Sequence, residues 1–384
     1  MMKVLWIGDA ITQSGFSIVT HNICNELRKK CEVVVYGIRY DGSVKNPYPY
    51  HIYPGQTPGN TYNFDRVGKI VKAEEPDVTI IFNDSFIVRR FLDTIPPGMT
   101  QIVLLFPVNL LPIEKTNLLA FSEPKFGVSE VMSYTEFSKQ KINEINPNLN
   151  VTAIYHGVNR NVFYPIKDAK AKLGLDGYFI VGNINANTTR KRLDLFLEGF
   201  AKFAKNKANV KCLIHATNQK PAYNLVKIAQ DLGIADKVIL SQNQLEFTDM
   251  NLLYNVLDIN VNTSVGEGFG LSLIEGSSCG VPVLCPAHGN LLDIWQQGAE
   301  FIKIARQEYV PSTDHIADII STDDFASKLD KFYNDRKFAR KKGEEALDYS
   351  KETKFSWKTV ADKVLGVIYK ANENKINVLF SIAV

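Results

Sequence analysis

Two acidic side chains with a fixed spacing are the first candidates for chemistry in this sequence. Glu267 and Glu275 lie eight positions apart in "SVGEGFGLSLIEG", residues 264–276, and three glycines surround the first of them. Residues 257–264 before the turn alternate apolar and polar side chains, which predicts a strand, and residues 271–279 after it predict a helix. The two acids therefore mark a glycine turn that joins a strand to a helix.

A helix that begins after a glycine turn is suited to bind a phosphate group. Its first N–H groups have no partner within the helix, and the positive end of the helix dipole lies there. Glu275, early in this helix, could accept hydrogen bonds from ribose hydroxyls, and Glu267 on the turn could contact what lies beyond the phosphates. The two acids thus fit opposite ends of a nucleotide-sugar. Many α/β proteins carry an acid near such a turn without a ligand, and a helical glutamate usually faces solvent, so the spacing alone leaves both interpretations open.

A second polar segment, "NANTTRKR" at residues 185–192, follows another predicted strand. Arg190 and Lys191 stand near the start of the next predicted helix, where positive charge opposes the helix dipole. A diphosphate ligand would explain this placement, because charge-assisted hydrogen bonds to phosphate are stronger than neutral ones. The alternative is a solvent-exposed basic pair that binds nothing.

A third segment, "TQSGFSIVTHNI", follows the first predicted strand. Gly15 allows the backbone to come close to a ligand. His21, about two turns into the following helix, is expected to be a packed or solvated histidine rather than a catalytic base. Open α/β sheets bind ligands at the carboxyl ends of their strands, which also selects "NDS" at residues 83–85 and "PVN" at residues 107–109.

The elements that must position these residues read as two series of alternating strands and helices. A break rich in Asn and Pro separates the series at residues 145–165. In the first series we expect strands at 3–8, 31–38, 77–82 and 100–106, helices at 14–30 and 64–76, a long irregular loop at 42–62, and a strand running into a helix at 126–145. In the second we expect strands at 178–183, 210–216, 237–242 and 281–285, helices at 190–206 and 222–234, and a helical tail from 321 onward. Such a pattern predicts an α/β fold with two Rossmann-like domains built on parallel sheets.

Composition places the chain among soluble globular proteins. Its 384 residues are 45% hydrophobic and 22% charged, with a net charge of +3 that is too small to indicate a nucleic-acid partner. The N-terminus leads directly into a strand, without the features of a signal peptide. Five cysteines form no CxxC pair, which favours reduced core thiols and a cytoplasmic location. Basic clusters at residues 28–30 and 340–342 could contact a membrane surface peripherally, or could be solvated helix faces.

Metal-binding patterns are not found in the sequence. It contains no HExxH and no Asp-x-Asp, and its six histidines are scattered. We therefore expect no metal and no other cofactor.

Taken in order, these segments resemble the retaining glycosyltransferases of family 4, which have the GT-B fold and an E-x7-E pair. The resemblance is carried by "SGFSIVTHNICNEL", "EPDVTIIFND", "YTEFSKQKI", "YHGVNRNVFYP", "TRKRLDLFLEGF", "VGEGFGLSLIEGSSCGVPVL" and "FSWKTVADKVLGVIY", and it covers nearly the whole chain. It implies two Rossmann-like domains with a deep cleft between them: an acceptor domain at 1–158, onto which residues 357–384 pack back, and a nucleotide-sugar donor domain at 159–356.

The resemblance also implies a function and roles for individual residues. A hexose would move from a UDP- or GDP-sugar to a glycan, lipid or other hydroxyl acceptor, without a metal. Glu267, Arg190 and Lys191 would be catalytic, the two cations by stabilising the departing diphosphate and Glu267 by contacting the sugar, while Glu275 would bind the ribose. The other expected donor-binding residues are Gly15, Gln242, Asn243, Gly268, Phe269, Gly270 and Leu271. The candidate acceptor-site residues are Phe16, Asn83, Asp84 and Asn109.

Three departures from the family pattern keep other functions open. Asn185 stands near the place where many members have an arginine, "LLFPVNLLP" lacks the histidine that many members carry, and "AHGNLLD" replaces a Gly-Gly turn with His288 and a single glycine. The alternatives are a non-catalytic protein that binds nucleotide-sugars, and a GT-B epimerase or phosphorylase.

Overall fold

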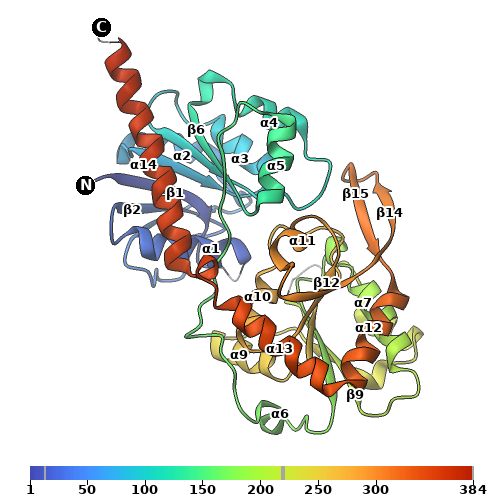
Figure 1. Cartoon of the computed structure of the whole chain (residues 1–384). Coiled ribbons are helices and arrows are strands. Elements are labelled where there is room, and N and C mark those ends of the chain that lie inside the picture. The colour runs from blue at the N-terminus through green and yellow to red at the C-terminus, as the bar shows by residue number, and fades with distance from the viewer. Residues whose placement is uncertain (13, 218–220, 383–384) are drawn as a thin grey trace. The chain divides into compact units, whose positions relative to one another are not determined.

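The structure is a computed structural model that describes residues 1–12, 14–217 and 221–382 (Figure 1). The described chain divides into two compact units. The first unit contains Met1–Val108, Ile113–Gly157 and the C-terminal stretch from Lys354, and the second contains Asn109–Pro112 and Val158–Thr353.

The unit boundaries can be compared with those that the sequence indicated. The chain passes from the first unit to the second between Gly157 and Val158, one residue before the expected boundary after residue 158. The chain returns to the first unit at Lys354, slightly before the expected residue 357. The short segment Asn109–Pro112 differs, because it was expected in the first unit and belongs to the second.

The first unit is built on a parallel sheet whose strands follow the order β3-β2-β1-β4-β5-β6-β7. Its strands are β1 (Lys3–Asp9), β2 (Glu32–Ile38), β3 (His51–Pro54), β4 (Val78–Phe82), β5 (Gln101–Leu105), β6 (Val128–Ser133) and β7 (Val151–Ala153). The central strands are apolar along their length because helices cover both faces of such a sheet. The chain changes direction between β1 and β4, so the carboxyl ends of these two strands form the switch point where open sheets bind ligands.

Helices of the first unit include one from the far end of the sequence. They are α1 (Gly15–Leu27), α2 (Phe64–Glu74), α3 (Ser85–Leu92), α4 (Lys115–Ala120), α5 (Glu136–Ile145) and α14 (Trp357–Ile382). The long helix α14 packs against α1, β5 and β6 (Figure 1), and its buried side chains Val360, Val364 and Ile368 repeat at helical spacing. The expected return of the C-terminal helix to the N-terminal unit is therefore confirmed. The sequence analysis missed α3, and it missed β3 within the expected irregular loop.

The second unit repeats the same architecture. Its parallel sheet follows the order β10-β9-β8-β11-β12-β13, with the switch point between β8 and β11. The strands are β8 (Phe179–Ile184), β9 (Val210–His215), β10 (Val238–Ser241), β11 (Ile259–Val261), β12 (Val283–Pro286) and β13 (Ala299–Ile302). An antiparallel hairpin of β14 (Ile304–Val310) and β15 (His315–Ile320) follows, which the sequence analysis did not predict. The prediction of two Rossmann-like units is thus confirmed.

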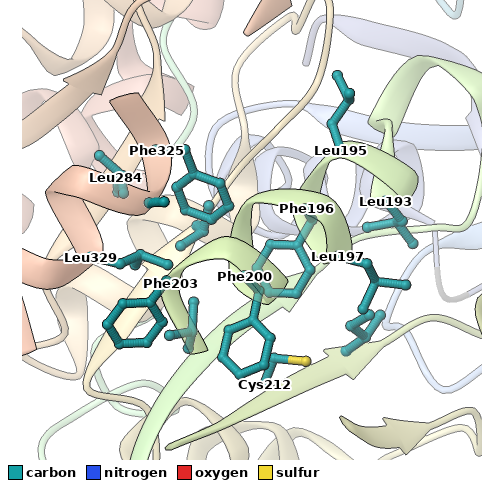
Figure 2. Packing of buried hydrophobic residues seen from close by; sticks show 14 of the residues in the cluster. Leu193, Leu195, Phe196, Leu197, Phe200, Phe203, Cys212, Leu284, Phe325 and Leu329 are labelled. Carbon is teal, nitrogen blue, oxygen red and sulfur yellow. The ribbon is translucent and has the colours of Figure 1, made fainter. Parts of the chain in front are cut away.

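Helix α7 forms the centre of the core of the second unit. The helices of this unit are α6 (Ala169–Lys172), α7 (Leu193–Ala204), α8 (Leu225–Asp231), α9 (Phe247–Asn255), α10 (Leu271–Ser278), α11 (Gly289–Trp295), α12 (Thr322–Asn334) and α13 (Arg336–Ser350). Figure 2 shows Phe196 and Phe200 of α7 packed among buried side chains that include Phe325 of α12. The two helices approach closely at Gly199, where an added Cβ would lie 2.1 Å from Cδ1 of Phe325.

Two further observations concern the environment of the chain. The five cysteines all lie in the described part of the chain, where each is buried and none forms a disulfide. No helix among the described residues combines the length and apolar character needed to cross a bilayer.

Candidate active site

The switch point of the second sheet brings Arg190, Lys191 and Glu267 together. The two cations lie on a 3-10 turn, Thr189–Lys191, between β8 and α7, and Glu267 lies on the loop between β11 and α10. Arg190 Nη1 is 3.3 Å from Glu267 Oε1, and Lys191 Nζ forms an ion pair with Glu267 Oε2. Residues 76 positions apart in the sequence therefore form one charged cluster at the carboxyl edge of the sheet.

This cluster is largely withdrawn from water. Glu267 is 7% exposed, and the Lys191 side chain is 11% exposed. Burial alone would raise the pKa of Glu267, but the charges of Lys191 and Arg190 more than offset it, so this pKa lies well below its usual range. Burial lowers the pKa of Lys191 to about 8, with Glu267 opposing the shift and Arg190 adding to it. At neutral pH the cluster thus holds two cations and one anion, a net positive charge suited to a phosphate.

Arg192, the third basic residue of the segment, points to another partner. Its backbone is left-handed, with φ of 48°, at the start of α7. Its Nη2 lies 2.9 Å from Asp194 Oδ2. This pairing leaves Arg190 and Lys191 as the two cations of the segment that contact Glu267.

The glycines of the motif allow close contacts that a larger residue would prevent. The Gly266 carbonyl accepts a hydrogen bond of 2.7 Å from Arg190 Nη1. A Cβ on Gly266 would lie 2.2 Å from the carbonyl oxygen of Asn109. Gly270, with φ of 83°, is the N-cap of α10, and a left-handed residue at this place favours glycine.

The predicted donor-loop residues lie around this turn. Phe269 is 2% exposed, Gly268 is also buried, and Leu271 is the first residue of α10. Asn109 belongs to the second unit, so the expectation that it would serve on the N-terminal domain is corrected: its carbonyl lies beside Gly266 because Leu111 pairs with Ile316 of β15.

Polar side chains that the sequence analysis did not assign hold the motif loop in place. Asn290 Nδ2 donates to the Glu267 carbonyl at 2.8 Å, and His288 Nε2 lies 2.8 Å from the Ser264 carbonyl. Ser264 Oγ donates to Glu267 Oε2 at 3.2 Å. His288 had been recognised only as a departure from the family pattern. Its position just after a buried strand, at the edge where the other site residues lie, was the available signal.

Glu275 lies deeper in the second unit, on the fifth position of α10. It is 9% exposed, so the interpretation of a solvated helix face is wrong. Tyr254 Oη on α9 donates a hydrogen bond of 2.6 Å to Glu275 Oε2. Burial raises the pKa of Glu275 to about 7, although the bond from Tyr254 acts in the opposite direction. A buried carboxyl near its midpoint at neutral pH is typical of a functional site.

Gln242 and Asn243 occupy the loop between β10 and α9. Both side chains are exposed. The expected contact of these two residues with the donor remains a prediction.

The first unit has its own polar cluster at its switch point. Asp9, at the end of β1, is fully buried and accepts from Ser14 Oγ at 2.9 Å and from Asn83 Nδ2 at 3.5 Å. Burial raises the pKa of Asp9, against the effects of Arg39, Ser14 and Asn83. The sequence analysis selected Asn83 but missed Asp9, although "GDA" follows the first strand.

The other residues selected in the first unit lie close to this cluster along the chain. Gly15 begins α1, and the ring of Phe16 packs edge-on against Phe82 with centroids 5.0 Å apart. Asp84 is the N-cap residue of α3. His21 is 4% exposed, with Nδ1 2.8 Å from Tyr50 Oη, and burial lowers its pKa to about 4. The interpretation of His21 as a packed histidine is confirmed.

A comparison with protein families agrees with the geometry of the second unit. Residues 165–348 match the family model for glycosyl transferases group 1. The matched region includes the cations on the 3-10 turn, the motif loop and both glutamates, so the charged cluster lies within the part of the chain that is similar to this family.

The chain is also similar to curated proteins over part of its length. The chain is 23% identical over 232 residues to N-acetyl-alpha-D-glucosaminyl L-malate synthase of Bacillus anthracis. The match covers 58% of this chain and 56% of that relative. The chain spans about half the length of this relative.

Solved structures establish the fold over nearly the whole chain. Sucrose-phosphate synthase from Thermosynechococcus elongatus aligns with a TM-score of 0.78 at 16% identity, covering 96% of this chain and 98% of that one. HepE of Anabaena, solved in complex with UDP and glucose, aligns with a TM-score of 0.73 at 16% identity. This alignment covers 96% of this chain and 100% of that one. The fold is GT-B, as the sequence indicated.

Proposed function

We propose that the protein is a retaining glycosyltransferase of family 4, which moves a hexose from a UDP- or GDP-sugar to a hydroxyl acceptor. The observation that carries this proposal is the buried cluster of Arg190, Lys191 and Glu267 at the switch point of the second sheet. The match of residues 165–348 to glycosyl transferases group 1 supports the transferase class.

The donor diphosphate takes the place of Glu267 as the partner of the two cations. Arg190 and Lys191 then stabilise the negative charge that grows on the nucleoside diphosphate as the bond to the sugar breaks. Because these cations are fixed and poorly solvated, they do so with little reorganisation. Glu267, released from the ion pairs, contacts the transferred sugar near its anomeric carbon. Retention of configuration follows if the acceptor hydroxyl attacks from the face that the diphosphate leaves.

Glu275 binds the ribose hydroxyls of the donor, and Gln242 and Asn243 lie along the base. The complex of HepE with UDP and glucose supports a uridine nucleotide as the first donor to test. The reaction needs no metal ion in this proposal, since two protein cations act on the diphosphate.

The acceptor is a glycan, a lipid-linked sugar or another alcohol. We assign it to the first unit, at the polar cluster of Asp9, Ser14 and Asn83, with Phe16 and Asp84 nearby in sequence. The free, buried cysteines support a cytoplasmic location. Peripheral contact with a membrane would use the exposed basic cluster at residues 28–30.

The experiment is a thermal-shift panel of UDP, GDP, UDP-glucose and GDP-mannose in buffer with EDTA, followed by calorimetry on variants. One nucleotide class should raise the melting temperature by mass action. Arg190→Ala and Lys191→Ala should each weaken nucleoside diphosphate binding roughly 10- to 100-fold, the loss of charged hydrogen bonds, and leave free nucleoside binding unchanged.

The matched control is Lys227→Ala, which removes an exposed lysine paired with Asp231 on α8. This variant should bind like the wild type. Equal diphosphate affinity in all three variants and the wild type would remove the basis of the proposal. Transfer activity that is lost in EDTA and restored by manganese would refute the metal-free mechanism.

A non-catalytic nucleotide-sugar-binding protein is the second candidate. The observation that favours it is Asn185, which stands near the place of an arginine in many family members and here donates to Asn183 Oδ1 at 2.7 Å. Product analysis separates the two functions. A transferase releases nucleoside diphosphate from its donor, by transfer or by slow hydrolysis, whereas a binding protein returns the donor intact. An epimerase would return an isomer of the donor, and a phosphorylase would consume phosphate.

A further inference from the structure

Tyr254 makes a buried contact with Glu275 that no sequence motif indicated. Tyr254 lies on α9, with 0% of its surface exposed, and its hydroxyl donates to Glu275 Oε2 at 2.6 Å. The ring is fixed by its surroundings: Phe163 packs edge-on against it, with centroids 5.6 Å apart. A rigid aromatic ring therefore places one hydroxyl against one oxygen of the carboxylate.

The groups around Tyr254 and Glu275 show how the Tyr254 hydroxyl affects the ionisation of Glu275. Among the described residues, the titratable groups that act on Tyr254 are Glu275 and Cys279, the residue that caps the end of α10, and the one that acts on Glu275 is Tyr254. Burial raises the pKa of both Tyr254 and Cys279, so both are neutral at physiological pH. The Tyr254 hydroxyl is then a neutral donor, and its bond favours the ionised form of Glu275.

We infer that Tyr254 is a positioning residue for nucleotide recognition: its hydroxyl orients the Glu275 carboxylate and keeps it able to accept hydrogen bonds from the ribose diol. This inference rests on the proposed function, in which Glu275 binds the ribose. An ionised carboxylate can accept several hydrogen bonds at once, whereas a protonated one has lost part of this capacity. Ordering by Tyr254 also reduces the conformational cost that the carboxylate would otherwise incur when the ribose binds.

The test is the isosteric change Tyr254→Phe, with calorimetry between about pH 6 and about pH 9, a range that includes the Glu275 midpoint. The probe is UDP, or GDP if only GDP binds the wild type, compared with its 2′,3′-dideoxy analogue. Near neutral pH the change should weaken binding of the ribonucleotide about 10-fold, the effect of losing one charged hydrogen bond. It should leave binding of the dideoxy analogue unchanged.

The pH profile provides the second readout. Wild-type affinity for the ribonucleotide should fall as the pH drops through about 7, where Glu275 takes up a proton. Without the Tyr254 bond this midpoint should move to higher pH. A change in packing alone would weaken both nucleotides equally and would not move the midpoint.

Tyr349→Phe is the matched control, since Tyr349 is another buried tyrosine of the second unit whose hydroxyl donates to the Ile294 carbonyl. It should leave both nucleotide affinities and the pH midpoint unchanged. If the wild type binds the ribonucleotide and Tyr254→Phe binds it equally well at every pH, the inference fails while the proposed function stands. If the wild type binds neither UDP nor GDP, the proposed function fails and the inference fails with it.

Discussion

At the scale of single residues, Glu267 is the counter-ion of two partly buried cations, Arg190 and Lys191. A phosphate must compete with this carboxylate for Arg190 and Lys191. Removing the charge of Glu267 should therefore change anion binding and protein stability in opposite directions. Binding of an anion should become stronger, while the folded protein should become less stable, because buried cations lose their partner.

We predict that Glu267→Gln increases affinity for nucleoside diphosphate by roughly 3- to 10-fold and lowers the free energy of unfolding by about 1–3 kcal/mol. Calorimetry measures the first quantity and urea denaturation the second. Asp231→Asn is the control, because Asp231 forms an exposed pair with Lys227 and should change neither quantity measurably. A variant that binds the diphosphate more weakly than the wild type would show that Glu267 does not compete with it.

The same carboxylate gives a pH signature. The pKa of Glu267 is depressed in the folded protein, so its stabilising contribution is complete above the unfolded pKa of about 4.5 and is lost as the pH falls below that value. The wild type should consequently lose more stability than Glu267→Gln below about pH 4.5. Parallel pH profiles of stability would contradict this.

The sequence identified most of the residues that gather at the second switch point, but not how they pair. Arg190 and Lys191 are recognisable because cations near a helix start oppose the helix dipole, and Glu267 because it lies in a glycine turn that joins a strand to a helix. Tyr254 could not be recognised, since a tyrosine in an amphipathic helix is usually core. Its role depends on the distance to Glu275, which only the packing of α9 on α10 determines.

At the scale of elements, the contact between α7 and α12 depends on Gly199. We predict that Gly199→Ala lowers the free energy of unfolding by about 1–3 kcal/mol, because its new methyl group would clash with the buried ring of Phe325. This cost should exceed the gain of about 1 kcal/mol that alanine brings to a helix. Urea denaturation followed by fluorescence measures the change.

Gly366 offers the matched control on α14. It is exposed, and an added Cβ would meet nothing within 4 Å. Gly366→Ala should therefore raise stability by about 0.5–1 kcal/mol. If Gly199→Ala also stabilises the protein, Gly199 does not lie in close contact with Phe325.

Most elements were predictable from apolar runs and helical periodicity, and the misses have identifiable causes. Strands such as β1 and β4 are buried on both faces, which makes their sequences almost continuously apolar. Strand β14 of the hairpin is largely exposed and carries the polar run Arg306–Glu308, so its hydrophobic signal is weak. Helix α3 spans only eight residues, too few for its periodicity to stand out.

At the scale of the whole molecule, an ion pair with one buried partner links α14 to β6 within the first unit. Lys370 Nζ on α14 lies 2.8 Å from Glu130 Oε1 on β6, and the Glu130 side chain is 0% exposed. Losing the lysine would leave a buried carboxylate without its cation, which is strongly unfavourable. The Lys370 side chain is 55% exposed, so water compensates in part.

We predict that Lys370→Met lowers the free energy of unfolding by about 1–3 kcal/mol, less than a fully buried pair would lose. Lys358→Met is the control, because Lys358 lies on the same helix in an exposed pair with Asp362. It should change stability by less than about 0.5 kcal/mol. Urea denaturation of both variants decides between them, and equal effects would mean that the Glu130 pair does not hold α14.

The division of the chain into two units has a consequence for the order in which these units can fold during synthesis. A ribosome releases residues from the N-terminus onward, and domains usually fold in that order. Here the first unit needs α14, which follows the second unit along the chain, so residues Asn109–Pro112 and Val158–Thr353 have all emerged before it. The second unit can therefore complete its fold while the first still exposes the apolar surface that α14 will cover. Along the chain, the residues of the second unit are thus complete before those of the first.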